Sequence, residues 1–266
     1  MRNTSASDNG KYPEFCYFAS KRDDVFRSFK INPVYTEILE HTSPQQGADY
    51  LSIILNNKNL NLGADTWRTL LQNDSVGSPK VTTYKFSNNS ITCSPTTLRY
   101  IKVLSDIINL FDIDQIKTVS EVGIGYAGQC RILLKMLKIH QYNLVDLPEV
   151  LALAERFLNV LDPQNGGGAV RYFDGTHLYN DIVSDLFISN YAFSELNRTV
   201  QDIYLEKVIL KAKFGYITWN APLIQSVFKL GGYSLDEFLK IIPNANIFPE
   251  QPLTAPGNCI VVWGNK

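Results

Sequence analysis

The spacing of hydrophobic positions changes twice between residues 116 and 146, in the segment IKTVSEVGIGYAGQCRILLKMLKIHQYNLVD. A short apolar run ends at Glu121, and a glycine-rich turn separates it from RILLKMLK, whose apolar side chains recur at helical spacing. A second short apolar run, YNLV, ends at Asp146. The pattern predicts a strand, a turn, a helix and a second strand. Two strands joined in this way need a right-handed crossover, so a parallel sheet is expected.

The chain after Asp146 continues to alternate between helical and extended patterns. A helix is predicted from Pro148, and strands are predicted over 170–173, 186–189 and 216–219. The last apolar runs, NIFPEQPL and GNCIVVWG, predict two strands joined by a turn around Pro256 and Gly257. The expected fold class is α/β, with a Rossmann-like sheet that is mostly parallel and has an antiparallel last strand.

Helical patterns dominate the first 110 residues. Two short helices are predicted around Pro33, a third over QQGADYLSIILNN, and a long one over SPTTLRYIKVLSDIINLFD. The polar start of the chain is expected to be flexible. We therefore expect three parts: a flexible N-terminus (1–20), a mostly helical cap that shapes the substrate region (21–112), and a cofactor-binding Rossmann-like domain (113–266).

The turn after the first strand has the spacing of a nucleotide-binding loop. Gly123, Gly125 and Gly128 form G-x-G-x-x-G, and Asp146 follows at roughly the expected 20 residues, where it can accept hydrogen bonds from a ribose. Both a nicotinamide or flavin dinucleotide and S-adenosylmethionine fit this spacing. Glu121 favours S-adenosylmethionine, because a carboxylate attracts its cationic end and repels a pyrophosphate.

Composition limits the other classes of function. The chain has 266 residues, of which 45% are hydrophobic and 19% charged, and its formal net charge is −1. This charge, together with the lack of a basic block, argues against nucleic acid as a partner. No run approaches the ~20 apolar residues of a membrane span, so a cytoplasmic protein is expected. Cys16, Cys93, Cys130 and Cys259 show no C-x-x-C spacing, and no metal site is predicted.

Several segments together resemble a known family. EVGIGYAGQCRILLK, LVDLPEVLALAERFL and DLFISNYAFSEL resemble the sugar O-methyltransferases, a branch of the class I S-adenosylmethionine-dependent methyltransferases. The resemblance runs from about residue 67 to the C-terminus, and it departs from the family pattern at Ile124, where a further glycine is frequent. It implies a class I methyltransferase sheet, S-adenosyl-L-methionine as cofactor, and a sugar hydroxyl of a glycan or of a nucleotide- or lipid-linked sugar as acceptor.

The cofactor-binding candidates follow from positions in this predicted sheet. Leu147 is expected against the adenine ring, and Asp174 and Gly175 at its edge. Arg99 and Tyr100 begin the helix that precedes the first strand; they either hold the carboxylate of the methyl donor or are a surface ion-pair residue and a core residue. The full set of candidates is Tyr100, Glu121, Gly123, Gly125, Gln129, Asp146, Leu147, Asp174, Gly175 and Asn190.

The acceptor side needs a general base, since a sugar hydroxyl is a poor nucleophile near neutral pH. His177 and Glu195 are the candidates, although a lone histidine and an acid near a helix start also have ordinary structural roles. Tyr191, Trp219 and Asn220 are predicted to contact the sugar. Metal independence is expected, because no compact cluster of ligand residues stands out.

Three alternatives stay open. The glycine loop would also serve an NAD(P)-dependent oxidoreductase, and the fold would also serve a non-catalytic cofactor-binding scaffold. A methyltransferase with a small phenol or an amine as acceptor is the third. The oligomeric state is open as well, with a homodimer among the options.

Overall fold

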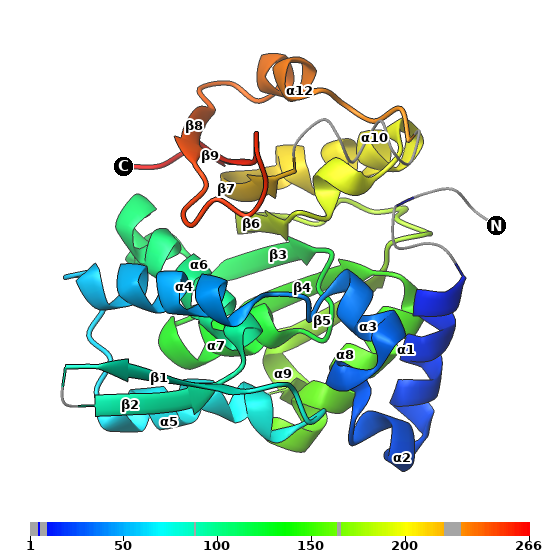
Figure 1. Ribbon diagram of the computed structural model, residues 1–266. Helices are drawn as coiled ribbons and strands as arrows, with labels where there is room; N and C mark the ends of the chain where they lie inside the picture. Colours follow the sequence, from blue (N-terminus) through cyan, green and yellow to red (C-terminus); the bar gives the residue numbers. More distant parts are fainter. Residues whose placement is uncertain (1–4, 6–9, 88, 164–165, 221–229) are drawn as a thin grey trace.

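A seven-stranded sheet forms the centre of the computed structural model, which describes residues 5, 10–87, 89–163, 166–220 and 230–266 (Figure 1). Its strand order is β5-β4-β3-β6-β7-β9-β8. The strands are β3 (Thr118–Val122), β4 (Gln141–Asp146), β5 (Val170–Asp174), β6 (Ser184–Asn190), β7 (Ala212–Trp219), β8 (Asn246–Pro249) and β9 (Cys259–Trp263). The pairings from β5 to β7 are parallel, and β9 runs antiparallel to both β7 and β8. The expected α/β class is confirmed, with a Rossmann-like sheet that is mostly parallel and has an antiparallel last strand.

The sheet is covered on both faces, which explains why its inner strands β3, β4, β6, β7 and β9 are buried along most of their length rather than at alternate residues. Successive residues of one strand belong to different core clusters: Leu144 packs with the first-half helices, and Val145 packs with the C-terminal elements. The same division separates Ile260 from Val261 on β9. A three-layer arrangement follows, with α10 (Arg198–Lys207) and α12 (Leu235–Ile241) on one side of the sheet in Figure 1.

The remaining helices lie on the other side of the sheet or belong to the cap. They are α1 (Lys11–Lys21), α2 (Asp23–Phe26), α3 (Pro33–Ile38), α4 (Pro44–Asn56), α5 (Ala64–Leu71), α6 (Pro95–Leu110), α7 (Gly128–Met136), α8 (Pro148–Leu161) and α9 (Gly166–Ala169). Short 3-10 helices are η1 (Phe29–Ile31), η2 (Gln72–Ser75), η3 (Ile113–Gln115), η4 (Phe193–Glu195) and η5 (Ile209–Lys211). A two-stranded hairpin, β1 (Thr82–Phe86) and β2 (Asn89–Cys93), completes the cap.

The expectation of a flexible segment over residues 1–20 is wrong for residues 11–20. These residues belong to α1, which lies beside α8 (Figure 1). Tyr12, Cys16 and Ala19 are buried at helical spacing, and the carbonyl oxygen of Ala19 accepts a hydrogen bond of 3.2 Å from Arg156 of α8. The apolar face of α1 therefore packs against α8, which the polar residues at the start of the chain did not indicate.

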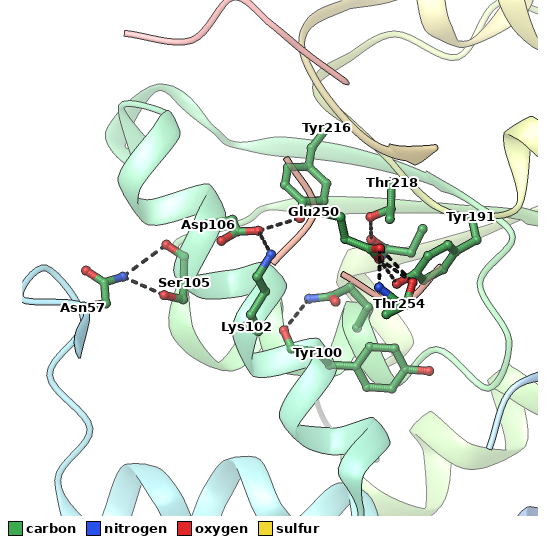
Figure 2. A network of polar contacts seen from close by, with 12 residues as sticks. Asn57, Tyr100, Lys102, Ser105, Asp106, Tyr191, Tyr216, Thr218, Glu250 and Thr254 are labelled. Carbon is green, nitrogen blue, oxygen red and sulfur yellow. Dashed lines mark hydrogen bonds and ion pairs between the residues drawn. The ribbon is translucent and has the colours of Figure 1, made fainter. Parts of the chain in front are cut away.

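The cap and the sheet share one hydrophobic core, which includes Tyr50 of α4, Leu104 of α6 and Leu144 of β4. Helix α6 begins as its sequence suggests, because Ser94 caps it through a hydrogen bond from the backbone N–H of Thr97 and Pro95 occupies the first turn. Asn57, just after α4, donates a hydrogen bond of 2.7 Å to Ser105 of α6 (Figure 2). The division between cap and cofactor domain at residue 112 stays a prediction.

Candidate functional site

A cavity of about 1520 Å³ opens where the parallel strands end and the cap covers them. Strand order reverses between β3 and β6, and ligands of open α/β sheets bind at the carboxyl ends of the strands near such a reversal. Of the predicted site residues, the following line the cavity: Tyr100, Glu121, Gly123, Gly125, Asp146, Leu147, Gly175, Asn190, Tyr191, Glu195 and Asn220. The structure therefore brings together most of the candidates from five strand ends and the helix α6.

The glycine loop connects β3 to α7 and uses left-handed backbone. Gly123 has a φ of 77° and Gly125 a φ of 54°. A Cβ at Gly123 would lie 2.0 Å from the Cβ of Ala192, and one at Gly125 would lie 2.8 Å from a methyl group of Leu39. The glycines are thus required by the turn and by the protein's own side chains, in addition to any ligand. Ile124, between them, also lines the cavity.

Glu121 is the buried acid of the site, with 2% of its surface exposed. Its Oε2 accepts a hydrogen bond of 2.6 Å from the hydroxyl of Tyr142 on the neighbouring strand β4. Burial raises the pKa of Glu121 to about 8, although the hydrogen bond from Tyr142 opposes the shift and the charge of Asp146 adds to it. A cation entering the cavity would restore the charged form, because an opposite charge nearby favours ionisation.

Asp146 closes the glycine loop from the tip of β4. Its Oδ2 accepts a hydrogen bond of 2.8 Å from the backbone N–H of Ile124, and its Oδ1 accepts one of 2.7 Å from Leu147. Burial raises the pKa of Asp146 to about 6, against the effect of these backbone hydrogen bonds. Each carboxylate oxygen has a second lone pair, so a ribose hydroxyl can still donate to this group.

His177, predicted as a general base, does not face the cavity. The ring of His177 lies 3.1 Å from the carboxylate of Asp174 and 2.7 Å from the hydroxyl of Thr176, with its side chain 55% exposed. Neither His177 nor Asp174 lines the cavity, whereas Gly175 and Thr176 do. The turn after β5 bends the histidine outward, so it does not face the acceptor region.

Glu195 is the second candidate base, and it does line the cavity. It ends η4, ahead of the longer α10, which begins at Arg198. Burial raises the pKa of Glu195 to about 7, while a short hydrogen bond from the side-chain amide of Asn220 acts in the opposite direction. The backbone N–H of Asn220 is in turn held by Ser194 Oγ at 3.0 Å. This carboxyl can therefore exchange a proton near neutral pH.

Tyr191 follows β6 directly and has left-handed backbone, with a φ of 68°. Its hydroxyl donates a hydrogen bond of 2.5 Å to Glu250, and the same carboxylate accepts bonds from the backbone N–H and the hydroxyl of Thr254 (Figure 2). The loop between β8 and β9 therefore fixes the Tyr191 side chain at the cavity wall.

Two further predicted residues, Trp219 and Gln129, do not reach the cavity. The indole of Trp219 is buried, with its ring centroid 6.0 Å from that of Phe193 and 5.1 Å from that of Phe238. Neighbouring strand residues point to opposite faces, so Trp219 enters the core beneath α12 while Asn220 reaches the cavity. Gln129 is fully buried in α7 and donates its hydrogen bond to the backbone oxygen of Tyr100 at 3.2 Å.

Residues of the cap and of α1 form a part of the site that the sequence pattern did not indicate. Tyr12, His41, Tyr50 and Leu39 line the cavity together with the predicted residues. Burial and the nearby charge of Arg99 lower the pKa of His41. Helical spacing predicts which cap residues are buried but does not indicate which of them face the sheet's carboxyl edge. No sequence signal could have identified them.

Neither a metal site nor a membrane span is found in the described part of the chain. Within it, no group of three or more His, Cys, Asp or Glu side chains is arranged to hold a metal ion. None of its helices combines the length and the apolar character needed to cross a bilayer. Metal independence stays a prediction.

No protein-family model and no curated protein matches the sequence. Among solved structures, the chain is similar to the methyltransferase domain of bacterial CtHen1, at 16% identity and a TM-score of 0.47, over 62% of this chain and 96% of that one. It is similar to an O-methyltransferase family protein from Burkholderia thailandensis (11% identity, TM-score 0.42, 56% and 51% covered). It is also similar to PigF with SAH, at 16% identity and a TM-score of 0.42, over 59% of this chain and 52% of that one. The resemblance to sugar O-methyltransferases is not confirmed, and function has to be inferred from the cavity itself.

Proposed function

We propose that this chain is an S-adenosylmethionine-dependent O-methyltransferase whose acceptor is a sugar hydroxyl. The observation that carries the proposal is the pairing of Glu121 and Asp146 in one cavity, around a left-handed glycine loop at the strand-order reversal. Glu121 suits the ammonium end of the donor and Asp146 suits its ribose. A dinucleotide would place two phosphate charges beside these acids, which disfavours the oxidoreductase alternative.

The size and lining of the cavity support a polar acceptor beside the donor. Ligand pockets commonly measure ~300–1,000 Å³, and this cavity of about 1520 Å³ exceeds that range. Amides and hydroxyls line it, and these are groups that hydrogen-bond to sugar hydroxyls: Thr42, Gln46, Tyr50, Asn190, Tyr191, Asn220, Thr254 and Asn258. A small phenol would leave many of these polar groups without a ligand partner.

S-adenosylmethionine, when bound, supplies an activated methyl group. The contribution of the chain is to hold donor and acceptor in line, to exclude water under the cap, and to accept the proton of the acceptor hydroxyl. Glu195 is the proposed base, because it lines the cavity and its pKa lies near 7. Asn220, which donates to Glu195, fixes the orientation of the carboxylate.

Calorimetry with S-adenosylhomocysteine, S-adenosylmethionine and NAD tests the proposal directly. Micromolar binding of the first two and no binding of NAD is expected. Glu121→Ala and Asp146→Ala should each lose this binding while circular dichroism shows an intact fold. NAD binding without binding of either adenosyl ligand would favour the oxidoreductase. Donor binding by a protein that turns over none of a panel of sugars, phenols and amines would favour the scaffold.

A further inference from the structure

Arg99 is the only arginine or lysine among the described residues that line the cavity. Acidic residues are far more numerous there: Glu14, Glu37, Glu121, Asp146, Glu149 and Glu195. This excess of acids suits a cationic methyl donor and disfavours an anionic ligand over most of the cavity. A single cation in these surroundings therefore marks one place where an anionic group would be stabilised.

No ion pair within the described ranges includes Arg99. Its guanidinium carbon lies 5.7 Å from the ring centroid of Tyr100 and 5.7 Å from that of Tyr191. Its hydrogen bond to the backbone oxygen of Leu39 is long, at 3.4 Å. The charge of Glu40 acts on Arg99, but the two side chains form no ion pair. A guanidinium has five N–H donors, so Arg99 retains donors for a ligand.

The surroundings of Arg99 belong to the acceptor side of the cavity. Its neighbours are the cap residues Leu39, Glu40, His41 and Tyr50, together with Tyr191 at the end of β6. The groups that act on the Glu121 carboxyl are Tyr142 and Asp146, and Arg99 is not one of them. The ammonium and carboxylate of the donor share one carbon atom, so a donor held by Glu121 keeps its carboxylate near Glu121, which is not among the charges that act on Arg99.

We propose that Arg99 binds an anionic group of the acceptor sugar, either a phosphate or a carboxylate. This inference rests on the proposed function and narrows its substrate class to sugar phosphates, phosphate-linked sugars and uronates, in preference to neutral sugars. The planar guanidinium can bind either anion through two parallel hydrogen bonds. Tyr100 and Tyr191 stabilise the cation by cation–π attraction and limit the orientations open to the guanidinium.

The test is calorimetric titration of the S-adenosylhomocysteine-saturated protein with glucose 6-phosphate, glucuronate and glucose. We expect at least one anionic sugar to bind ten times or more as tightly as glucose, and the stronger of the two identifies the anion. Arg99→Gln should abolish this preference and leave the affinity for S-adenosylhomocysteine within twofold. Arg198→Gln, which removes an arginine that pairs with Glu237 outside the cavity, is the matched control and should change neither.

Several results would overturn the inference. One is equal or undetectable binding of all three sugars by the wild-type protein. Another is an Arg99→Gln variant that binds S-adenosylhomocysteine ten times more weakly but binds 5′-methylthioadenosine normally, since Arg99 would then hold the donor carboxylate. If Arg99→Gln does not fold, Arg99→Lys replaces it, and an unchanged anion preference there would exclude bidentate binding. Failure of the proposed function would give a different result from failure of the inference about Arg99, because the wild-type protein would then not bind S-adenosylhomocysteine at all.

Discussion

The hydroxyl of Tyr142 lies 2.6 Å from Oε2 of Glu121, across the parallel pair formed by β4 and β3. This hydrogen bond supports the ionised form of a carboxyl that burial pushes toward the neutral form, with a resulting pKa of about 8. At neutral pH the free protein therefore holds Glu121 mostly protonated. Binding of a cationic ligand must release this proton, and donor affinity and pH become linked.

Donor affinity should rise with pH between about 6 and 8. Each pH unit below the pKa of Glu121 costs about 1.4 kcal/mol to ionise it, so the dissociation constant should fall by up to about tenfold per unit. Calorimetry with S-adenosylhomocysteine at pH 6, 7 and 8, in buffers of different ionisation enthalpy, measures both the affinity and the proton released. 5′-Methylthioadenosine lacks the ammonium group and is the control. Equal pH profiles for the two ligands would contradict the assignment of Glu121.

Tyr142→Phe should weaken donor binding at pH 7 several-fold relative to the wild-type protein. The substitution removes the hydrogen bond to Glu121 and thus raises the pKa of that carboxyl further above its usual range. Because the defect is one of ionisation, affinity should recover toward the wild-type value as the pH rises to 9. Titrations of both proteins at pH 7 and pH 9 provide the measurement. A loss of the same size at both pH values would instead indicate a defect in packing.

The glycine loop and the two acids of the site could be predicted from the sequence, because they lie close together along the chain. Strands β3 and β4, the turn and the acids at both strand tips lie within 31 consecutive positions, 116–146. Strand alternation is the sequence signal that separates Trp219 from Asn220, because neighbouring strand residues face opposite sides. His41 and Tyr50 could not be predicted, since only tertiary packing brings the cap onto the end of the sheet. The direction of the His177 side chain could not be predicted either, because it depends on the tight turn after β5.

Stability of the ligand-free protein should decrease as the pH rises from about 4.5 to about 8. The pKa values of Asp146, Glu195 and Glu121 are raised to about 6, 7 and 8, so the folded state binds more protons than the unfolded state in this range. Their stabilisation is complete below the unfolded pKa and is lost as the pH passes each folded value.

Urea denaturation at pH 5 and pH 8 measures this difference. Glu121→Gln cannot ionise and should reduce the pH dependence by on the order of a few kcal/mol. Glu237, whose pKa is lowered to about 2, acts below this window. The lowered pKa of His41 opposes the trend, but it does so in both proteins and cancels in the comparison with Glu121→Gln. An unchanged pH dependence in Glu121→Gln would show that this carboxyl is not the titrating group.

Glu195→Gln should abolish most turnover and leave donor binding intact. A general base contributes roughly 10²- to 10⁴-fold to rate, and kcat should follow an apparent pKa near 7 in the wild-type protein. His177→Ala is the control, because His177 lies outside the cavity, and its kcat should be unchanged. Initial rates between pH 6 and 9, on an acceptor found active with the wild-type protein, measure both effects. Normal turnover by Glu195→Gln would place the base elsewhere.

Gly123→Ala should destabilise the protein by about 3 kcal/mol or more, because the new Cβ would lie 2.0 Å from that of Ala192 and the residue has a φ of 77°. Ala192→Gly removes the clash, so the double variant should regain stability and retain a cost of about 1–2 kcal/mol for the left-handed backbone. Gly63→Ala, where no atom lies within 4 Å of the added carbon, is the control and should change stability little.

Urea denaturation of the two single variants and the double variant completes a double-mutant cycle. The expected coupling is large and favourable, because a Cβ at position 123 clashes with that of Ala192 and not with a glycine there. Since Ala192 follows Tyr191 directly, this close approach joins the glycine loop to the acceptor side of the cavity. Simple additivity of the two substitutions would mean that the loop and the end of β6 are not packed as described, and the arrangement of the whole site would have to be revised.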